Sequence, residues 1–188
     1  EIRKELGLLG SDYVLLTLHR PSNVDNPEVL GGIMKAAVKL SERIPVLFPI
    51  HPRTSKMLGH IGPENTSHEV SRYHSYKNSN VWLLPPLGYL DFLQLMQHTN
   101  LVLTDSGGIQ EETTILNVPC LTLRRNTERP VTVKLGTNKV IGTSPTKVLE
   151  EAYKALDTPI VRSRRPPLWD GKAGQRIAVV ISKILGDS

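Results

Sequence analysis

The residues best suited to bind an anion form one string at residues 105–112, which reads DSGGIQEE. The string follows an apolar run and opens a segment with helical spacing, so Ser106, Gly107 and Gly108 fall at the start of a predicted helix. The free N–H groups of a first helical turn favour a phosphate, and glycines let a ligand approach the backbone closely. An ordinary strand-to-helix turn with a good N-cap explains the same residues equally well.

Two glutamates follow one turn later in the same predicted helix. Glu112 comes four residues after Gly108, which places both residues on one face. A carboxylate there can accept hydrogen bonds from a vicinal diol such as that of ribose, although a solvated surface charge is the commoner fate of a glutamate. Glu111 points in another direction, so at most one of the two is expected to hold a ribose. Asp105 is expected to cap or brace the turn.

Other residues that could contact an anion follow further apolar runs. His19 and Arg20 come directly after residues 13–18. Histidine can transfer protons near neutral pH, and arginine pairs with phosphate oxygens. A histidine satisfied by backbone groups at a strand end is the alternative. Arg129 either clamps a phosphate or pairs with a carboxylate such as that of Glu128.

Short apolar runs alternate with segments of helical spacing along the chain. Strands are predicted at residues 13–18, 45–50, 81–84, 101–104, 119–123 and 139–141, and helices at 27–43, 54–61, 89–98, 108–116, 146–156 and 173–185. This pattern predicts an α/β fold, a Rossmann-like parallel sheet with helices on both faces. Ligands bind beyond the carboxyl ends of the strands in such sheets. The polar segment 63–80 is predicted to be a surface insertion.

Length and composition narrow the class of protein. The 188 residues suffice for one buried core, so a single domain over residues 1–188 is expected. The formal net charge of +5 suits anionic ligands such as nucleotides, and a merely basic protein equally well. Nucleic-acid binding is disfavoured because the basic residues are scattered and aromatic residues make up only 5%. Neither a metal-ligand cluster nor a dinucleotide fingerprint is present, so no metal and no cofactor are expected.

The sequence also gives expectations for the compartment and for the completeness of the chain. No apolar run approaches the length of a membrane span and no signal peptide is recognisable, so we expect a cytoplasmic protein without membrane contact. The single cysteine, Cys120, lies in an apolar run and is expected to be a core residue rather than a nucleophile. The chain begins at Glu1 in what reads as the end of a helix, so we expect a missing part upstream.

Five segments together resemble one family. They are TLHR at 17–20, PIH at 49–51, LTDSGGIQEE at 103–112, LR with TERP within 123–130, and DGKA at 170–173. Their order is similar to that in the C-terminal domain of the non-hydrolysing UDP-N-acetylglucosamine 2-epimerases. The resemblance covers almost the whole chain apart from residues 63–80. It implies the glycosyltransferase-B architecture, in which two Rossmann-like domains face each other across a cleft, and this chain would be the C-terminal, nucleotide-binding half.

The resemblance also implies roles for matching residues. The residues that would bind UDP are Leu87, Phe92, Ser106, Gly107, Gly108, Glu112 and Arg129. In this assignment the serine and the glycines contact the phosphates, the glutamate contacts the ribose, and the leucine and phenylalanine lie beside the uracil. His19 would be the catalytic residue, near the departing diphosphate. Arg20 and His51 resemble residues that some bacterial members use for a second, allosteric UDP-sugar.

The family reaction interconverts UDP-N-acetylglucosamine and UDP-N-acetylmannosamine through elimination of UDP to a glycal and its re-addition to the other face. In the family, a lysine and the acid/base carboxylates come from the N-terminal domain. We therefore expect residues 1–188 alone to bind UDP weakly and to show no epimerase activity. Family members are often dimers, so a homodimer of the full-length form is expected. Three residues depart from the family pattern and bear on fine positioning: Ser22, Val131 and Trp169.

Other functions remain compatible with these residues. A glycosyltransferase of the same fold would also carry a nucleotide-binding C-terminal domain with a glutamate presented by a helix. A hydrolysing relative would release free N-acetylmannosamine. A stand-alone UDP-binding domain would have no catalytic partner half.

Overall fold

The computed structural model describes residues 2–61, 73–158 and 165–186. Seven strands form one sheet in the order β3-β4-β2-β1-β5-β6-β7. The strands are β1 (Val14–Thr17), β2 (Val46–Pro49), β3 (His74–Ser75), β4 (Val81–Leu84), β5 (Leu101–Thr104), β6 (Cys120–Thr122) and β7 (Asn138–Val140). All neighbouring pairs are parallel except β3 with β4. The parallel strands therefore share one carboxyl edge.

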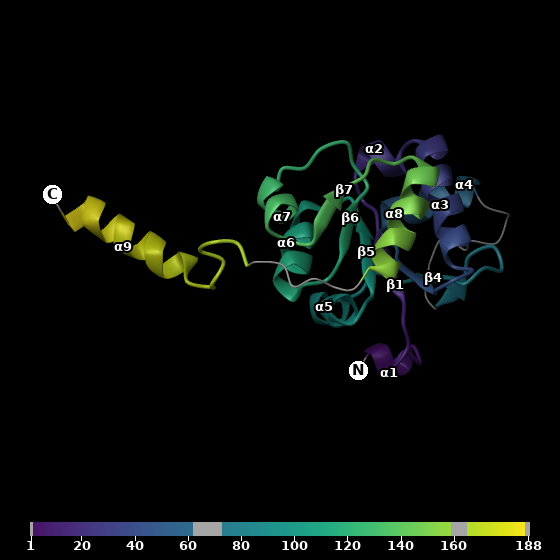
Figure 1. Cartoon of the computed structure of the whole chain (residues 1–188), viewed down its shortest axis with the longest axis horizontal. Coiled ribbons are helices and arrows are strands. Elements are labelled where there is room, and N and C mark those ends of the chain that lie inside the picture. Colours follow the sequence, from purple (N-terminus) through teal and green to yellow (C-terminus); the bar gives the residue numbers. More distant parts are fainter. Residues whose placement is uncertain (1, 62–72, 159–164, 187–188) are drawn as a thin grey trace.

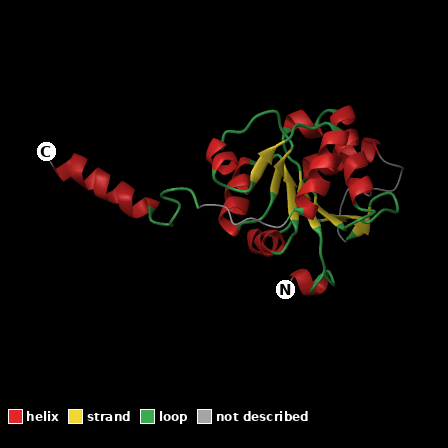
Figure 2. Cartoon of the chain, in the orientation of Figure 1, coloured by secondary structure: helices red, strands yellow, loops and turns green. Residues whose placement is uncertain are grey.

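Helices cover both faces of the sheet, as predicted (Figures 1 and 2). On one face lie α3 (Pro27–Leu40) and α8 (Pro145–Asp157), and on the other lie α1 (Ile2–Glu5), α5 (Tyr89–Gln97) and α6 (Gly107–Leu116). Successive residues of β1 face opposite ways: Val14 packs in the cluster on the α3 side, and Leu15 packs in the cluster on the α5 side. This alternation between two apolar layers explains why the strands are continuous apolar runs.

Local sequence fixes where α3 begins. Pro27 occupies the first helical turn, where its missing N–H costs nothing. The Asn26 side chain accepts hydrogen bonds from the backbone N–H groups of Glu28 at 2.9 Å and Val29 at 3.2 Å. These bonds satisfy donors that have no partner within the helix. The helix starts at Pro27, as predicted, but α3 ends at Leu40, three residues before the predicted end at Arg43.

Three elements were not predicted. The short helices α2 (Pro21–Val24) and α7 (Pro130–Lys134) lie in segments that carry no helical repeat long enough to recognise. Strand β3 lies inside the segment expected to be a surface insertion, and its His74 pairs antiparallel with Leu83 of β4. The first part of that segment, residues 63–72, lies outside the described residues. The expected helix at residues 54–61 begins earlier, as α4 (Pro52–Ile61).

The last helix, α9 (Ala173–Gly186), extends away from the sheet in Figure 1. None of its side chains is buried, and Ile177, Ile184 and Leu185 are more than half exposed. Across the described part of the chain, no helix combines the length and the apolar character that crossing a bilayer requires.

Candidate functional site

The carboxyl ends of β1 and β5 lie side by side, because the strands pair in parallel with their last residues opposite each other. The residue after β5 is Asp105, whose side chain is fully buried. Its carboxylate accepts hydrogen bonds from the backbone N–H groups of His19 at 3.1 Å and Arg20 at 3.0 Å. It also accepts one from the Asn23 side chain at 3.1 Å. Asp105 therefore braces the turn after β1 and does not cap α6.

Asp105 also orients the His19 side chain. The Nδ1 atom of His19 lies 3.0 Å from Oδ1 of Asp105. Because carboxylate oxygens accept and do not donate, Nδ1 carries the hydrogen and Nε2 is left for a ligand. The His19 side chain is 43% exposed, whereas that of Asp105 is 0% exposed. The imidazole thus lies beside a buried carboxylate. The alternative suggested by the sequence was a histidine satisfied by backbone groups at a strand end.

The N-terminus of α6 follows directly after Asp105. Ser106 is the N-cap residue, and its side chain makes no capping hydrogen bond. The first turn of the helix contains no acidic residue, so nothing within it neutralises the positive end of the helix dipole. A Cβ atom added to Gly107 would lie 3.4 Å from Oε2 of Glu128, and one added to Gly108 would meet nothing closer than 4.0 Å. The turn is therefore exposed at Gly108, whereas Gly107 is buried beside the Glu128 carboxylate.

Three arginines, called here the arginine cluster, lie around the carboxylate of Glu128: Arg20, Arg124 and Arg129. Arg124 Nη2 lies 2.9 Å from one oxygen of Glu128, and Arg20 Nη2 lies 3.2 Å from the other. The hydrogen bond from Arg124 is the main cause that lowers the pKa of Glu128. The Glu128 carboxylate thus joins two cations beside the N-terminus of α6, which is the kind of position that a phosphate favours.

Arg129 uses a different carboxylate. Its Nε atom lies 2.7 Å from Oε1 of Glu111. The pairing that the sequence suggested, with the neighbouring carboxylate of Glu128, is therefore replaced by an ion pair between α6 and the start of α7. Both side chains are about two-fifths exposed, at 42% and 39%, so the pair is accessible to solvent and to a ligand.

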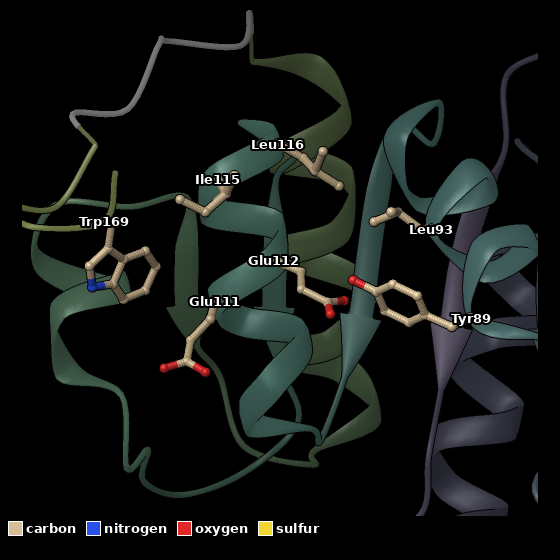
Figure 3. A pocket seen from close by; sticks show the side chains of 7 residues that line it. All are labelled: Tyr89, Leu93, Glu111, Glu112, Ile115, Leu116 and Trp169. Atoms are coloured by element: carbon tan, nitrogen blue, oxygen red, sulfur yellow. The ribbon is translucent and has the colours of Figure 1, made fainter. Parts of the chain in front are cut away.

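The two glutamates of α6 point in different directions, as predicted. Figure 3 shows the Glu112 carboxylate directed toward the Tyr89 hydroxyl, with Glu111 turned away from it. Tyr89 donates a hydrogen bond to Glu112. Partial burial raises the pKa of Glu112; the Tyr89 hydrogen bond opposes this and the Glu111 charge adds to it. Both glutamates line a pocket of about 410 Å³ together with Tyr89, Leu93, Ile115, Leu116 and Trp169.

The two residues predicted to lie beside a uracil are close to α6. Leu87 and Phe92 are half-buried and pack against the core cluster on the α5 side, as does Ile109 of α6. Phe92 belongs to α5, and its backbone N–H donates to the Gly88 carbonyl at 3.0 Å. The structure therefore brings Leu87 and Phe92 to the same face of the sheet as the α6 turn.

His51 lies just after the end of β2, which is the strand next to β1. Its Nδ1 accepts a hydrogen bond from the backbone N–H of Arg53 at 3.2 Å, so the exposed imidazole caps the start of α4. Arg53 in turn pairs with Asp25. His51 and Arg20 thus stand at neighbouring strand ends.

Several residues of the site were missed from the sequence. Arg124 was named only as part of the LR segment of the resemblance, and Tyr89 was given no role because an isolated tyrosine carries no pattern of its own. Gln110 was treated only as part of a motif, yet it is fully buried and hydrogen-bonded to Ser106 and Thr127. Its position four residues after Ser106 was the available signal, since i and i+4 residues adjoin on a helix.

Known proteins of one family resemble this chain. The family model described as UDP-N-acetylglucosamine 2-epimerase matches residues 1–182. The UDP-N-acetylglucosamine 2-epimerase of Methanocaldococcus jannaschii is 40% identical over 93% of this chain and 46% of its own length. The UDP-2,3-diacetamido-2,3-dideoxy-D-glucuronate 2-epimerase of Pseudomonas aeruginosa is 33% identical over 95% of this chain and 47% of its own length. The chain thus spans about half the length of these curated relatives.

Solved structures of such epimerases are also similar to this chain. The M. jannaschii UDP-GlcNAc 2-epimerase in complex with UDP-GlcNAc and UDP superposes with a TM-score of 0.80 at 38% identity, over 97% of this chain and 48% of that chain. The Staphylococcus aureus MnaA–UDP structure gives 0.77 at 30% identity, over 99% and 49%. A glycosyltransferase at 16% identity shares the fold, with a TM-score of 0.51. Because the family model matches nearly all residues of the chain, the chain belongs to the UDP-N-acetylglucosamine 2-epimerase family.

Proposed function

We propose that this chain is the UDP-binding half of a UDP-N-acetylglucosamine 2-epimerase. One observation carries the proposal: the N-terminus of α6, whose first turn has no acidic residue, lies beside the arginine cluster. Backbone N–H groups at a helix start and guanidinium groups are the two donors that proteins use most for phosphates. The M. jannaschii and S. aureus relatives, which were solved with UDP or a UDP-sugar, support the choice of ligand.

Each part of UDP has a proposed partner. The diphosphate contacts the backbone of Ser106, Gly107 and Gly108 and the Arg129 guanidinium. Because the Glu128 carboxylate already occupies two guanidinium groups of the cluster, the diphosphate displaces it or shares them with it. The ribose hydroxyls replace the Tyr89 hydroxyl as donors to Glu112. The uracil packs beside Leu87 and Phe92.

The proposed reaction removes the proton from carbon 2 and breaks the bond between carbon 1 and the diphosphate, which gives a glycal and UDP. Re-addition of UDP, with a proton delivered to the opposite face of carbon 2, completes the inversion. His19 donates through Nε2 to the departing diphosphate when both ring nitrogens carry hydrogens, with Nδ1 held beside Asp105. The base at carbon 2 comes from an N-terminal domain, so residues 1–188 bind UDP but do not epimerise.

Further parts of the proposal concern the complete protein. Arg20 and His51, at neighbouring strand ends, would contact a second, allosteric UDP-sugar. The complete protein would form a homodimer and act in the cytoplasm, where the single thiol of Cys120 stays reduced.

Calorimetry of residues 1–188 with UDP, UMP and ADP tests nucleotide binding. UDP is expected to bind most tightly, because UMP lacks the second phosphate and the position beside Leu87 and Phe92 is assigned to a uracil rather than an adenine. Gly107→Val, whose side chain obstructs the turn, is expected to abolish UDP binding, whereas Gly174→Ala on exposed α9 leaves it unchanged. Equal affinity for UDP and ADP would contradict the uracil assignment, and absence of UDP binding would contradict the proposal as a whole.

A second experiment distinguishes the reactions. The complete protein is expected to convert UDP-N-acetylglucosamine to its manno epimer in the absence of any acceptor. Transfer of the sugar to an added acceptor would favour a glycosyltransferase, and release of free N-acetylmannosamine would favour a hydrolysing enzyme. Detection of the manno epimer with residues 1–188 alone would overturn the claim that the base lies elsewhere.

A further inference from the structure

A buried amide connects the α6 turn to the loop that carries Arg129. The Gln110 side chain is 0% exposed. Its Nε2 donates to the backbone carbonyl of Ser106 at 3.0 Å, and its Oε1 accepts from the Thr127 hydroxyl at 2.5 Å. Thr127 Oγ1 in turn accepts from the backbone N–H of Arg129 at 2.9 Å. A continuous hydrogen-bonded path thus runs from the α6 turn to Arg129.

A second side chain anchors this path to the sheet. Asn138 Nδ2 donates to Oε1 of Gln110 at 3.1 Å and to the Thr132 hydroxyl of α7 at 3.0 Å. The Thr122 hydroxyl of β6 donates to Oδ1 of Asn138 at 2.6 Å. Asn138, Thr132 and Thr122 are all buried. Because such a network has few alternative arrangements, it holds the backbone segments around it in one relative position.

Stability alone is a weak explanation for this network. Burying polar side chains costs desolvation, and well-packed apolar residues often stabilise a protein as much or more. The network lies between the α6 turn, whose backbone is proposed to contact the diphosphate, and residues 127–129, which carry the Arg129 guanidinium proposed to contact the same group. Distances between groups that bind one ligand must be kept within about 0.5 Å for full effect.

We propose that Gln110 is a positioning residue that fixes the spacing between the α6 turn and Arg129, so that both contact one diphosphate. The inference rests on the proposed function, because it takes the ligand to be UDP. Loss of Gln110 therefore weakens the binding of the diphosphate more than the binding of the nucleoside, since Glu112, Leu87 and Phe92 are outside the network.

The test compares Gln110→Met with wild type and with the control Thr113→Val. Thr113 is equally buried on α6, and its hydroxyl donates to the carbonyls of Ile109 and Gln110 within its own helix. Gln110→Met is expected to weaken UDP binding about fivefold to tenfold, as for the loss of one or two net hydrogen bonds. Uridine affinity, followed by NMR titration, should change less than about twofold. Thr113→Val should leave the ratio of the two affinities at its wild-type value.

A double-mutant cycle with Thr127→Val tests whether the path itself carries the effect. If Gln110 acts through Thr127, the two substitutions together weaken UDP binding no more than the larger single effect. Additive losses would overturn the proposal, as would an equal loss of uridine and UDP affinity in Gln110→Met. If Gln110→Met does not fold, Thr127→Val tests the same path from its other end.

A measurement without ligand separates this inference from the proposed function. Amide hydrogen exchange of Arg129 in the ligand-free protein is expected to be faster in Gln110→Met than in wild type and in Thr113→Val, because Thr127 loses the partner that holds its hydroxyl. Unchanged exchange at Arg129 would overturn the positioning role whether or not UDP binds. Faster exchange together with no UDP binding to wild type would uphold the path and reject UDP as the ligand.

Discussion

The Nδ1 atom of His19 lies 3.0 Å from Oδ1 of Asp105, and Asp105 is completely buried at the end of the neighbouring strand. The contact joins residues that are 86 positions apart in the chain, because β1 and β5 are parallel neighbours. It selects the histidine tautomer that leaves Nε2 free, and it ties that nitrogen to the backbone that starts α6. The proposed acid and the proposed phosphate-binding turn are thus parts of one rigid unit.

Replacing Asp105 by asparagine is expected to destabilise the fold. The carboxylate accepts hydrogen bonds from two backbone N–H groups and the Asn23 amide and lies 3.0 Å from Nδ1 of His19, and a single asparagine oxygen cannot replace both carboxylate oxygens. The free energy of unfolding should fall by about 2–3 kcal/mol, measured by urea denaturation. Asp12→Asn, at an exposed site, is the matched control. Equal changes in the two variants would contradict the bracing role.

Glu112 should make UDP affinity depend on pH in a range shifted upward from that of an ordinary glutamate. Burial raises its pKa above the ordinary value of 4.5. Its protonation as pH falls therefore begins at higher pH, and the protonated form is the weaker acceptor for ribose hydroxyls. Glu112→Gln should weaken UDP binding about tenfold at neutral pH, equivalent to about 1.4 kcal/mol.

The pH dependence of UDP affinity should differ between the wild-type protein and the Glu112→Gln variant. The ratio of wild-type to Glu112→Gln affinity is expected to shrink toward one as pH is lowered from neutral through the range in which Glu112 takes up its proton. Protonation of UDP itself affects both proteins alike and cancels in the ratio. A ratio that stays constant over this range would show that the ionised Glu112 does not contact the ligand.

Gly136→Ala should destabilise the packing of α7 against α6. A Cβ atom at this position would lie 2.6 Å from the Thr132 carbonyl oxygen and 2.7 Å from Cγ2 of Thr114. Both distances are too short for real contacts, so the backbone must shift, at a cost of about 1–3 kcal/mol in the free energy of unfolding. Gly174→Ala has open space and should cost nothing. Thermal unfolding of both variants tests this, and equal melting temperatures would refute it.

Cys120 should not react with thiol reagents while the protein is folded. Its side chain is buried, and burial raises the pKa of its thiol to about 12, so almost no thiolate forms near neutral pH. Titration with an aromatic disulfide should detect the thiol only after denaturant is added. Rapid reaction of the native protein would contradict the assignment of Cys120 to the core.

The sequence was sufficient for the elements that build the sheet and the site. Leu101–Thr104 and Val14–Thr17 are continuous apolar runs, and such runs are recognisable because both faces of the strand are covered. The start of α6 was placed within one residue, because a glycine pair after a strand marks a turn. Strand β3, with only two residues and a polar composition, depends on pairing with β4 and has no local signal.

The long-range side-chain contacts could not be predicted from the sequence alone. Arg20 contacts Glu128 across 108 positions, and Arg129 chooses Glu111 over its own neighbour Glu128. The choice depends on how α6 and α7 are placed relative to each other, which is set by packing rather than by spacing along the chain. The same holds for the link from Gln110 to Thr127.

The diphosphate is proposed to bind to the backbone at the start of α6. A crystal structure of residues 1–188 grown with UDP would locate it. Phosphate oxygens are expected within about 3 Å of the backbone nitrogens of Gly107 and Gly108, with Glu112 on the ribose. A bound UDP whose phosphates lie elsewhere, with Glu128 still in its place beside Gly107, would contradict this proposal.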